Sequence, residues 1–165
     1  MTVRTLDDGI KQAKALAAAN NHEAASVLLD ELLHDHSQEP EFWAARAYVS
    51  AHKQDYQAAE HDMGRAISLE EMEPDYFFTR GRYRSMSKRF MEAVADFTRT
   101  IELSDHHGSD YYRELALLLR AEAYLALGMV DLARADCKHI RDETVGWAGS
   151  VRSKADILAD CDRKT

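Results

Sequence analysis

The residues of this 165-residue chain that are best suited to chemistry stand in two short clusters of histidine and aspartate. The clusters are His34-Asp35-His36 and Asp105-His106-His107. Imidazole nitrogens and carboxylate oxygens bind zinc and related metals, so either cluster could serve a metal-dependent enzyme. Neither cluster shows the ligand spacing of a known metal site, and both fall where a helix is expected to end, a place where the helix dipole favours histidine. We therefore interpret both clusters as helix ends and expect no metal and no cofactor.

The sequence shows no further signature of catalysis. It has no glycine-rich phosphate loop, no nucleophile elbow and no pairing of cysteine with histidine. Cys137 and Cys161 lack a C-x-x-C spacing and stand among apolar neighbours, so we interpret them as buried free thiols. We expect no catalytic residues and a protein that is not an enzyme.

The charge balance narrows the class of partner. The chain holds 21 Lys and Arg against 29 Asp and Glu, a net charge of −8. Nucleic acids and anionic membranes are bound by clustered Lys and Arg, so this balance argues against both as the main partner. A basic protein would suit an acidic chain because complementary charge speeds encounter, although the same charge also serves simple solubility.

The compartment follows from the apolar segments and the cysteines. The start of the chain, MTVRTLDDGIKQA, is not apolar enough for a signal peptide, and no later run reaches the length of a membrane span. Together with two free thiols, this predicts a cytoplasmic location.

One spacing recurs along the chain. The stretch 55–69 (DYQAAEHDMGRAISL) aligns with the later stretch 89–103 (RFMEAVADFTRTIEL). The two stretches are separated by the same number of residues as the two prolines, Pro40 and Pro74. The later stretch 117–137 fits the same pattern only when the interval is lengthened by six residues, and these extra residues fall around SDHHGSD. We therefore expect a longer loop there, with an extra turn that starts near Asp110.

Each period contains two helices. Apolar residues recur at helical spacing, and a short polar turn (AHKQD, MSKR or LGMVD) divides each unit into two halves. Such helix pairs cannot bury their apolar faces alone and must stack on their neighbours.

This pattern resembles the tetratricopeptide repeat, a helix–turn–helix unit of about 34 residues. The small residue of the first helix is matched by Ala13, Ala47, Gly81 and Ala121. The alanine early in the second helix is matched by Ala25, Ala59, Ala93 and Ala133. The large residue facing the next unit is matched by Leu29, Met63, Phe97 and Cys137.

The resemblance implies an all-α fold, a right-handed superhelical stack of four helix pairs. The expected repeats are 6–39, 40–73, 74–107 and 109–142, after an N-terminal extension at 1–5. Residues 143–165 are expected to form a C-terminal capping helix that covers the last repeat. Its apolar face is predicted from the spacing of Val151, Ala155, Leu158 and Cys161, with Ser150 or Ser153 near its start.

Arginine and aspartate recur with the repeats. The pairs, which all have the same separation in the sequence, are Arg46 and Asp62, Arg80 and Asp96, and Arg120 and Asp136. This separation leads from the middle of one helix, around the turn, to the facing point on its partner helix. We predict ion pairs that hold the two helices of each unit together.

The resemblance implies that a partner binds in a concave groove lined by the first helices. The groove residues carried over by position are Ile10, Lys14, Ala44, Tyr48, His52, Phe78, Arg82, Met86, Leu118, Glu122 and Leu125. The combination of Tyr, Phe, Met and Arg is typical of a protein-binding hot spot. For Phe78 and Leu118 the alternative is packing against neighbouring helices. The carboxylate clamp known in this family is not matched, since its places hold Ile10, Lys14, Ala45, Asp75 and Thr79.

The sequence thus predicts a non-enzymatic module that binds another protein. The specific hypothesis is a cytoplasmic inhibitor, such as the immunity protein of a bacterial toxin. The alternatives are a secretion chaperone that holds a secreted substrate, or a general repeat scaffold. An alternative of another class is a metal-dependent enzyme that uses the His34/His36 or the His106/His107 cluster.

Overall fold

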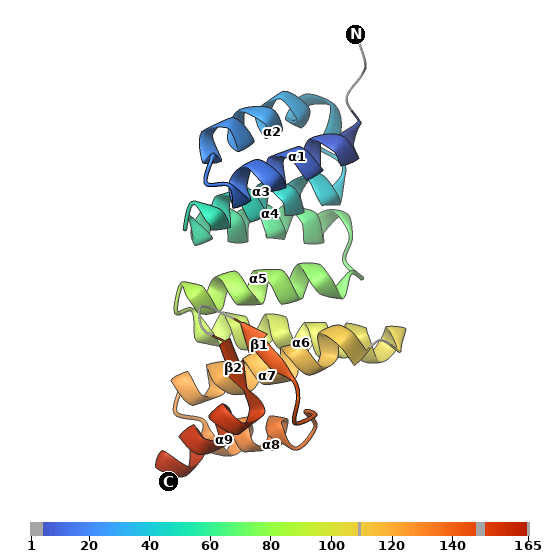
Figure 1. The fold of residues 1–165 in the computed structure, drawn as a ribbon. Coiled ribbons are helices and arrows are strands. Elements are labelled where there is room, and N and C mark those ends of the chain that lie inside the picture. The colour runs from blue at the N-terminus through green and yellow to red at the C-terminus, as the bar shows by residue number, and fades with distance from the viewer. Residues whose placement is uncertain (1–4, 109, 148–150, 165) are drawn as a thin grey trace. The chain divides into compact units, whose positions relative to one another are not determined.

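The computed structural model describes residues 5–108, 110–147 and 151–164, and these residues form helices and one short β-hairpin (Figure 1). The elements are α1 (Leu6–Ala18), α2 (His22–His36), α3 (Pro40–His52), α4 (Tyr56–Leu69), α5 (Pro74–Met86), α6 (Phe90–His107), α7 (Asp110–Ala126), α8 (Val130–Cys137), β1 (Val145–Trp147), β2 (Val151–Ser153) and α9 (Lys154–Arg163). The all-α stack of helix pairs expected from the repeat is confirmed, with the hairpin as an addition. Residues 1–4 of the expected N-terminal extension lie outside the described residues.

The chain divides into two compact units, unit 1 (Met1–Glu71) and unit 2 (Met72–Thr165). In unit 1, α1 packs against α2 and α3, and α3 packs against α4. In unit 2, α6 packs between α5 and α7, α7 packs against α8, and the C-terminal elements β1 and α9 lie against α7. Each unit therefore contains two of the expected helix pairs.

The turn inside each helix pair repeats the same backbone geometry. One residue of each turn has a positive φ, and these residues are Asn20 (60°), Gln54 (61°), Lys88 (61°) and Gly128 (76°). Their positions follow the sequence period, including the lengthened interval before Gly128. A left-handed residue reverses the chain in few residues, so the second helix can start at once and lie antiparallel to the first.

The repeated small residues are buried where helices meet. The exposed fraction is 0% at Ala13, Ala47, Ala121, Ala25, Ala59, Ala93 and Ala133. At the same position Gly81 of α5 leaves even less room, because a Cβ atom there would lie 2.8 Å from Cε1 of Phe97 and 3.2 Å from Cβ of Asp96. The close approach of α5 and α6 therefore depends on this glycine.

We expect Gly81→Ala to destabilise unit 2 by about 1–2 kcal/mol, because overpacking costs about 1–3 kcal/mol and the better helix propensity of alanine returns only about 1. The Phe97 ring is fully buried and cannot swing away. Urea unfolding of the variant measures the loss. In a Phe97→Leu background the cost of Gly81→Ala should shrink, and an unchanged cost in that background would contradict the steric explanation.

The six extra residues around SDHHGSD lengthen the two helices α6 and α7, so the expected longer loop is wrong. Helix α6 runs on to His107 and ends at Gly108, a left-handed C-cap with φ of 66° whose N–H donates to the Ser104 carbonyl. The next helix, α7, begins at Asp110 as expected. Arg113 Nε donates to Asp105 Oδ1 at 2.6 Å across this junction. Continuing the helix satisfies its backbone hydrogen bonds internally, whereas a loop of the same length would expose them.

The C-terminal segment is only partly the expected capping helix. Strands β1 and β2 form an antiparallel hairpin, with Gly146 opposite Arg152, and α9 starts only at Lys154. Ser153 is its N-cap, in a capping box with Asp156, in which the Ser153 N–H donates to Asp156 Oδ2 at 2.8 Å. The capping helix therefore starts later in the chain than predicted. Ser150 and the side chain of Val151 lie outside the described residues.

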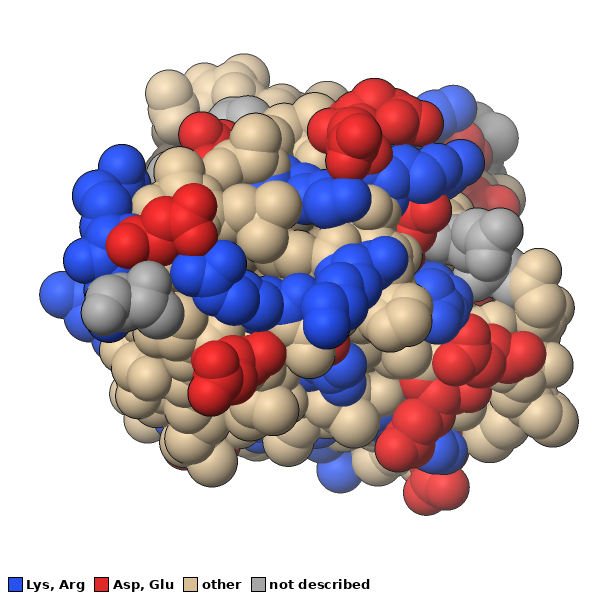
Figure 2. Space-filling model, turned by 90° about the horizontal axis from the view of Figure 1, so that it is seen from below, with Lys and Arg blue, Asp and Glu red and all other residues tan. Residues whose placement is uncertain are grey.

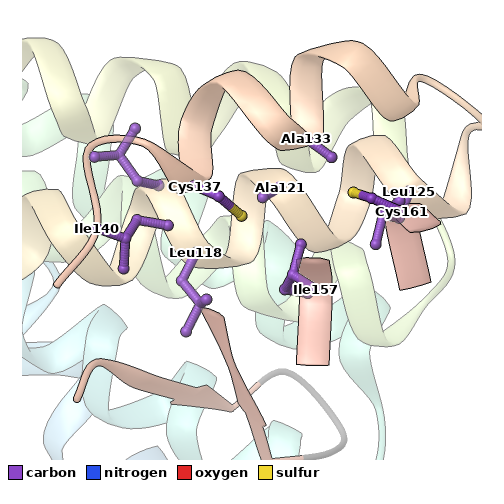
Figure 3. Packing of buried hydrophobic residues seen from close by; sticks show 9 residues of the cluster. Leu118, Ala121, Leu125, Ala133, Cys137, Ile140, Ile157 and Cys161 are labelled. Carbon is purple, nitrogen blue, oxygen red and sulfur yellow. The ribbon is translucent and has the colours of Figure 1, made fainter. Parts of the chain in front are cut away.

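The buried face of α9 differs from the predicted one. Ile157 and Cys161 are 0% exposed, whereas Ala155 is exposed and Leu158 is half-buried. Both buried residues enter a cluster with Leu118, Leu125 and other side chains of α7 and α8 (Figure 3). The predicted face included Val151 and Ala155, but the helix begins after Val151, so the apolar face is set by Ile157 and Cys161.

Candidate partner-binding surfaces

Two of the predicted groove residues of unit 1, Lys14 and His52, lie close to a third, Tyr48. The rings of Tyr48 and His52, one turn apart on α3, have centroids 4.4 Å apart. The Nζ atom of Lys14 on α1 lies 5.8 Å from the centroid of the Tyr48 ring, and the His22 ring of α2 lies 6.5 Å from that of His52. We call Lys14, His22, Tyr48 and His52 the unit 1 patch. Its members come from three helices and combine an aromatic face with a cation, a composition suited to protein contacts.

His22 was not predicted to lie on this surface. In the repeat, His22 stands at the position that holds the aromatic residues Tyr56 and Phe90 in the next two helix pairs, and it is a weak match to them. Since His22 is the first residue of α2, its place beside His52 follows from how α2 packs against α3, and the sequence period carries no signal for it.

Three predicted groove residues of unit 2 are buried, so their assignment to an open groove is wrong. Phe78 is 7% exposed and packs against the rings of Phe97 and Tyr112, with centroids 6.1 and 5.5 Å away. Leu118 is 0% exposed and Leu125 is 4% exposed. For Phe78 and Leu118 the alternative of packing against neighbouring elements therefore describes the structure.

The C-terminal elements cause this burial on α7. Gly146 of β1 approaches α7 so closely that a Cβ there would lie 2.9 Å from Cδ2 of Leu118. Leu125 packs in the cluster that holds Ile157 and Cys161 of α9. The face of α7 that the repeat resemblance assigns to a partner is thus covered by the chain's own hairpin and last helix.

Arg82 and Met86 on α5 are both half-buried. The guanidinium carbon of Arg82 lies 5.9 Å from the centroid of the Phe78 ring. Burial lowers the pKa of Arg82, with the charge of Asp75 acting in the opposite direction. Arg82 therefore serves partly as a packing residue over Phe78.

Glu122 lines a pocket of about 250 Å³ in unit 2. The lining residues, which we call the polar pocket, are Ser85, Phe90, Glu122, Ala123, Leu125, Ala126, Arg152, Asp160 and Lys164. Burial raises the pKa of the Glu122 carboxyl, and the charge of Arg152 opposes this shift. Ser85, Arg152 and Asp160 were not predicted as site residues, because only the fold of the C-terminal segment brings β2 and α9 to α5 and α7.

We expect Glu122→Gln to raise the free energy of unfolding at pH 7 and to change it much less at pH 4. Because the pKa of Glu122 is raised in the folded state, its protonated form is favoured there, and this contribution to stability is lost as pH rises through the folded-state pKa. Glutamine does not titrate, so its advantage should appear near neutral pH and vanish below the ordinary pKa of glutamate. Urea unfolding of both proteins at the two pH values measures the difference. The exposed Glu143, replaced by Gln, is the control, and a pH-independent effect at Glu122 would contradict the assignment.

The repeated arginines and aspartates form bidentate ion pairs, each between the two helices of one helix pair. Arg46 donates from Nε and Nη2 to Asp62 at 2.8 and 2.6 Å. Arg120 donates in the same way to Asp136 at 2.9 and 2.7 Å, and it also donates from Nη1 to Thr98 at 2.9 Å. The aspartate side chains are almost fully buried, so these pairs hold helices together and are not open to a partner.

The pair of Arg80 and Asp96 has an additional member, Arg84. Arg80 donates to Asp96 at 3.0 and 2.7 Å, and Arg84 Nη1 donates to the same carboxylate at 2.8 Å. Arg84 lies one helical turn after Arg80, a spacing that was visible in the sequence. The equivalent residues elsewhere are Ser50 and Tyr124, so the repeat gave no reason to single it out.

The two histidine clusters stand at helix ends, as expected. His34 and Asp35 are 96% and 75% exposed, with 3.9 Å between His34 Nε2 and Asp35 Oδ1. His106 and His107 close α6 with ring centroids 5.5 Å apart. Within the described ranges, no three His, Cys, Asp or Glu side chains are grouped so that they could hold a metal ion. A search of the same ranges finds no helix with the length and apolarity needed to cross a membrane.

The fold is therefore of the helical-repeat class, built from stacked helix pairs that resemble tetratricopeptide repeats. Among solved structures, the crystal structure of MamA protein is similar to this chain. The alignment covers 96% of this chain and 74% of that one, with a TM-score of 0.68 and 17% sequence identity. No family model matches the sequence, and no curated protein matches it.

Proposed function

We propose that this chain is a protein-binding module with no catalytic function of its own. The helical-repeat fold supports the class, since stacked helix pairs present extended surfaces to other proteins. The observation that carries the proposal further is the uneven charge. Unit 1 holds 6 Lys and Arg against 13 Asp and Glu, a net charge of −7, whereas unit 2 holds 15 against 16, a net charge of −1.

Most acidic side chains of unit 1 are open to solvent, whereas Asp62 is buried in its pair with Arg46. The exposed acids on its first two helices are Asp7, Asp8, Glu23, Asp30, Glu31 and Asp35. The C-terminal face of unit 2 differs, because a band of Lys and Arg crosses it with Asp and Glu on both sides (Figure 2). Cations of unit 2 are also paired with acids, as Arg134 is with Asp162 and Lys154 with Asp142. Unit 1 is thus the surface that would attract a basic partner.

Within this class, the specific proposal is a cytoplasmic inhibitor of a basic toxin. The acid excess of unit 1 supports it, because complementary charge gives the fast association that an inhibitor needs. A secretion chaperone would instead hold an unfolded substrate. Capture of the partner from source cells, its identification by mass spectrometry and reconstitution of the purified pair separate the two. A folded toxin whose activity is lost in the complex supports inhibition, and a partner bound only when unfolded contradicts it.

Tyr48 provides the test of the surface. We expect Tyr48→Ala to weaken binding of the purified partner by at least about 2 kcal/mol, because large aromatic residues dominate protein interfaces. The matched control is Tyr111→Ala, which removes a 69% exposed tyrosine from unit 2 and should change affinity little. Titration calorimetry at low and high salt measures both. Unchanged affinity for Tyr48→Ala together with a steep salt dependence would show that charge, and not the unit 1 patch, holds the partner.

A further inference from the structure

The polar pocket of unit 2 contains buried polar atoms that lack hydrogen-bond partners. Within the described part of the chain, Ser85 Oγ, Glu122 Oε2 and Arg152 Nε are all buried and make no hydrogen bond. All three residues line the same pocket. Because buried polar groups in proteins are nearly always hydrogen-bonded, three residues with such atoms in the lining of one pocket point to a site for a polar group from outside.

Three separate elements hold these atoms in place. Ser85 lies near the end of α5, Glu122 lies on α7 and Arg152 lies on β2. Arg152 Nη2 donates to Asp160 Oδ2 of α9 at 2.5 Å, which orients the guanidinium and leaves its Nε–H unused. On the rim, Lys164 Nζ donates to the Leu125 carbonyl at 2.7 Å and is already engaged.

The donors and acceptors of the pocket define the group that it fits. Glu122 Oε2 requires a donor, Arg152 Nε–H requires an acceptor, and the Ser85 hydroxyl can do either. The charged residues of the lining are two acids, Glu122 and Asp160, and two bases, Arg152 and Lys164, so the lining has no net charge. A carboxylate would be repelled by Glu122, and a lysine would leave Arg152 Nε–H without an acceptor.

We propose that the polar pocket binds the primary carboxamide of an asparagine or glutamine side chain presented by a partner protein. The amide oxygen accepts from Arg152 Nε, and the amide nitrogen donates to Glu122 Oε2. The apolar part of the lining, Phe90, Ala123 and Ala126, contacts the methylene groups of the side chain. This inference rests on the proposed function as a protein-binding module, and it names the chemistry that one of its sites would recognise.

The test uses capped pentapeptides, acetyl-Ala-Ala-X-Ala-Ala-amide, with X as Gln, Glu, Lys or Leu. Each is titrated into the isotope-labelled full chain while the backbone amide signals of Ala123 and Ala126 are followed by NMR. We expect saturable shifts with the Gln peptide and at least about tenfold weaker binding of the other three, since a site built to hydrogen-bond a group rejects analogues that lack it. Equal binding of the Leu peptide, stronger binding of the Lys or Glu peptide, or no binding of the Gln peptide would overturn the proposal.

Variants locate the binding. Glu122→Ala should lose at least about tenfold in affinity for the Gln peptide, and Ser85→Ala should lose less, because its hydroxyl is an auxiliary partner. Glu143→Ala, an exposed glutamate of the same unit, should bind like the unmodified chain. Unchanged binding by Glu122→Ala would place the peptide elsewhere. If the captured partner binds and the Gln peptide does not, the pocket assignment fails while the protein-binding function stands. If the Gln peptide binds and no partner protein does, the proposed function fails while the pocket assignment stands.

Discussion

Replacing Asp96 with alanine is expected to destabilise unit 2 by about 3–5 kcal/mol, because removing one partner of a buried ion pair leaves the other charge uncompensated. The Asp96 side chain is 4% exposed, and it accepts hydrogen bonds from both Arg80 and Arg84. The Arg80 and Arg84 side chains are 18% and 17% exposed, so bulk water compensates little for the lost carboxylate. Urea unfolding followed by circular dichroism measures the change.

The same helix offers a matched control for this substitution. Asp105 also pairs with an arginine, Arg113, but the two side chains are 55% and 30% exposed. Asp105→Ala should therefore cost no more than about 1 kcal/mol. Similar losses at Asp96 and Asp105 would contradict the dependence on burial.

A double-mutant cycle tests which arginine carries the interaction. Arg80→Ala should cost less than Asp96→Ala, because Arg84 remains bound to the carboxylate. The double variant should cost less than the sum of the single ones, since both remove the same pair. Additive losses would show that Arg80 and Asp96 do not stabilise the helix pair through each other.

Ile157→Ala should destabilise unit 2 by about 2–5 kcal/mol, the range for truncating a large aliphatic side chain in a core. Ile157 is 0% exposed and brings α9 into the cluster formed by α7 and α8 (Figure 3). The cavity left by the substitution would lie beside Leu118 and Leu125. Thermal and urea unfolding measure the loss.

Leu132→Ala on α8 is the control, because it removes an aliphatic side chain that is 48% exposed and should change stability by no more than about 0.5 kcal/mol. Deleting residues 144–165 should go further, exposing Leu118 and Leu125 and causing aggregation. A deletion variant that stays monomeric with an unchanged melting temperature would show that α9 and the hairpin are not required to cover α7.

The period of the sequence by itself determined the fold. Small residues at Ala47, Gly81 and Ala121 can recur at one position only if helices approach closely there, and the structure buries all three. The spacing between Arg46 and Asp62 likewise predicted that the two side chains face each other, because the chain between them runs along a helix, around a turn and into the next helix, all of fixed geometry. Such relations are local in the chain, and helix geometry leaves them little freedom.

Only the tertiary structure decided which faces of the helices remain open. Leu118 and Leu125 sit at positions that the repeat resemblance assigns to a groove, yet β1 and α9 cover them. The polar pocket exists because β2 brings Arg152 back to Glu122 from a separate part of the sequence. The sequence period cannot predict a contact of this kind, because the contact joins a non-repeating segment to a repeat. Where that segment folds back depends on which apolar surface it can bury.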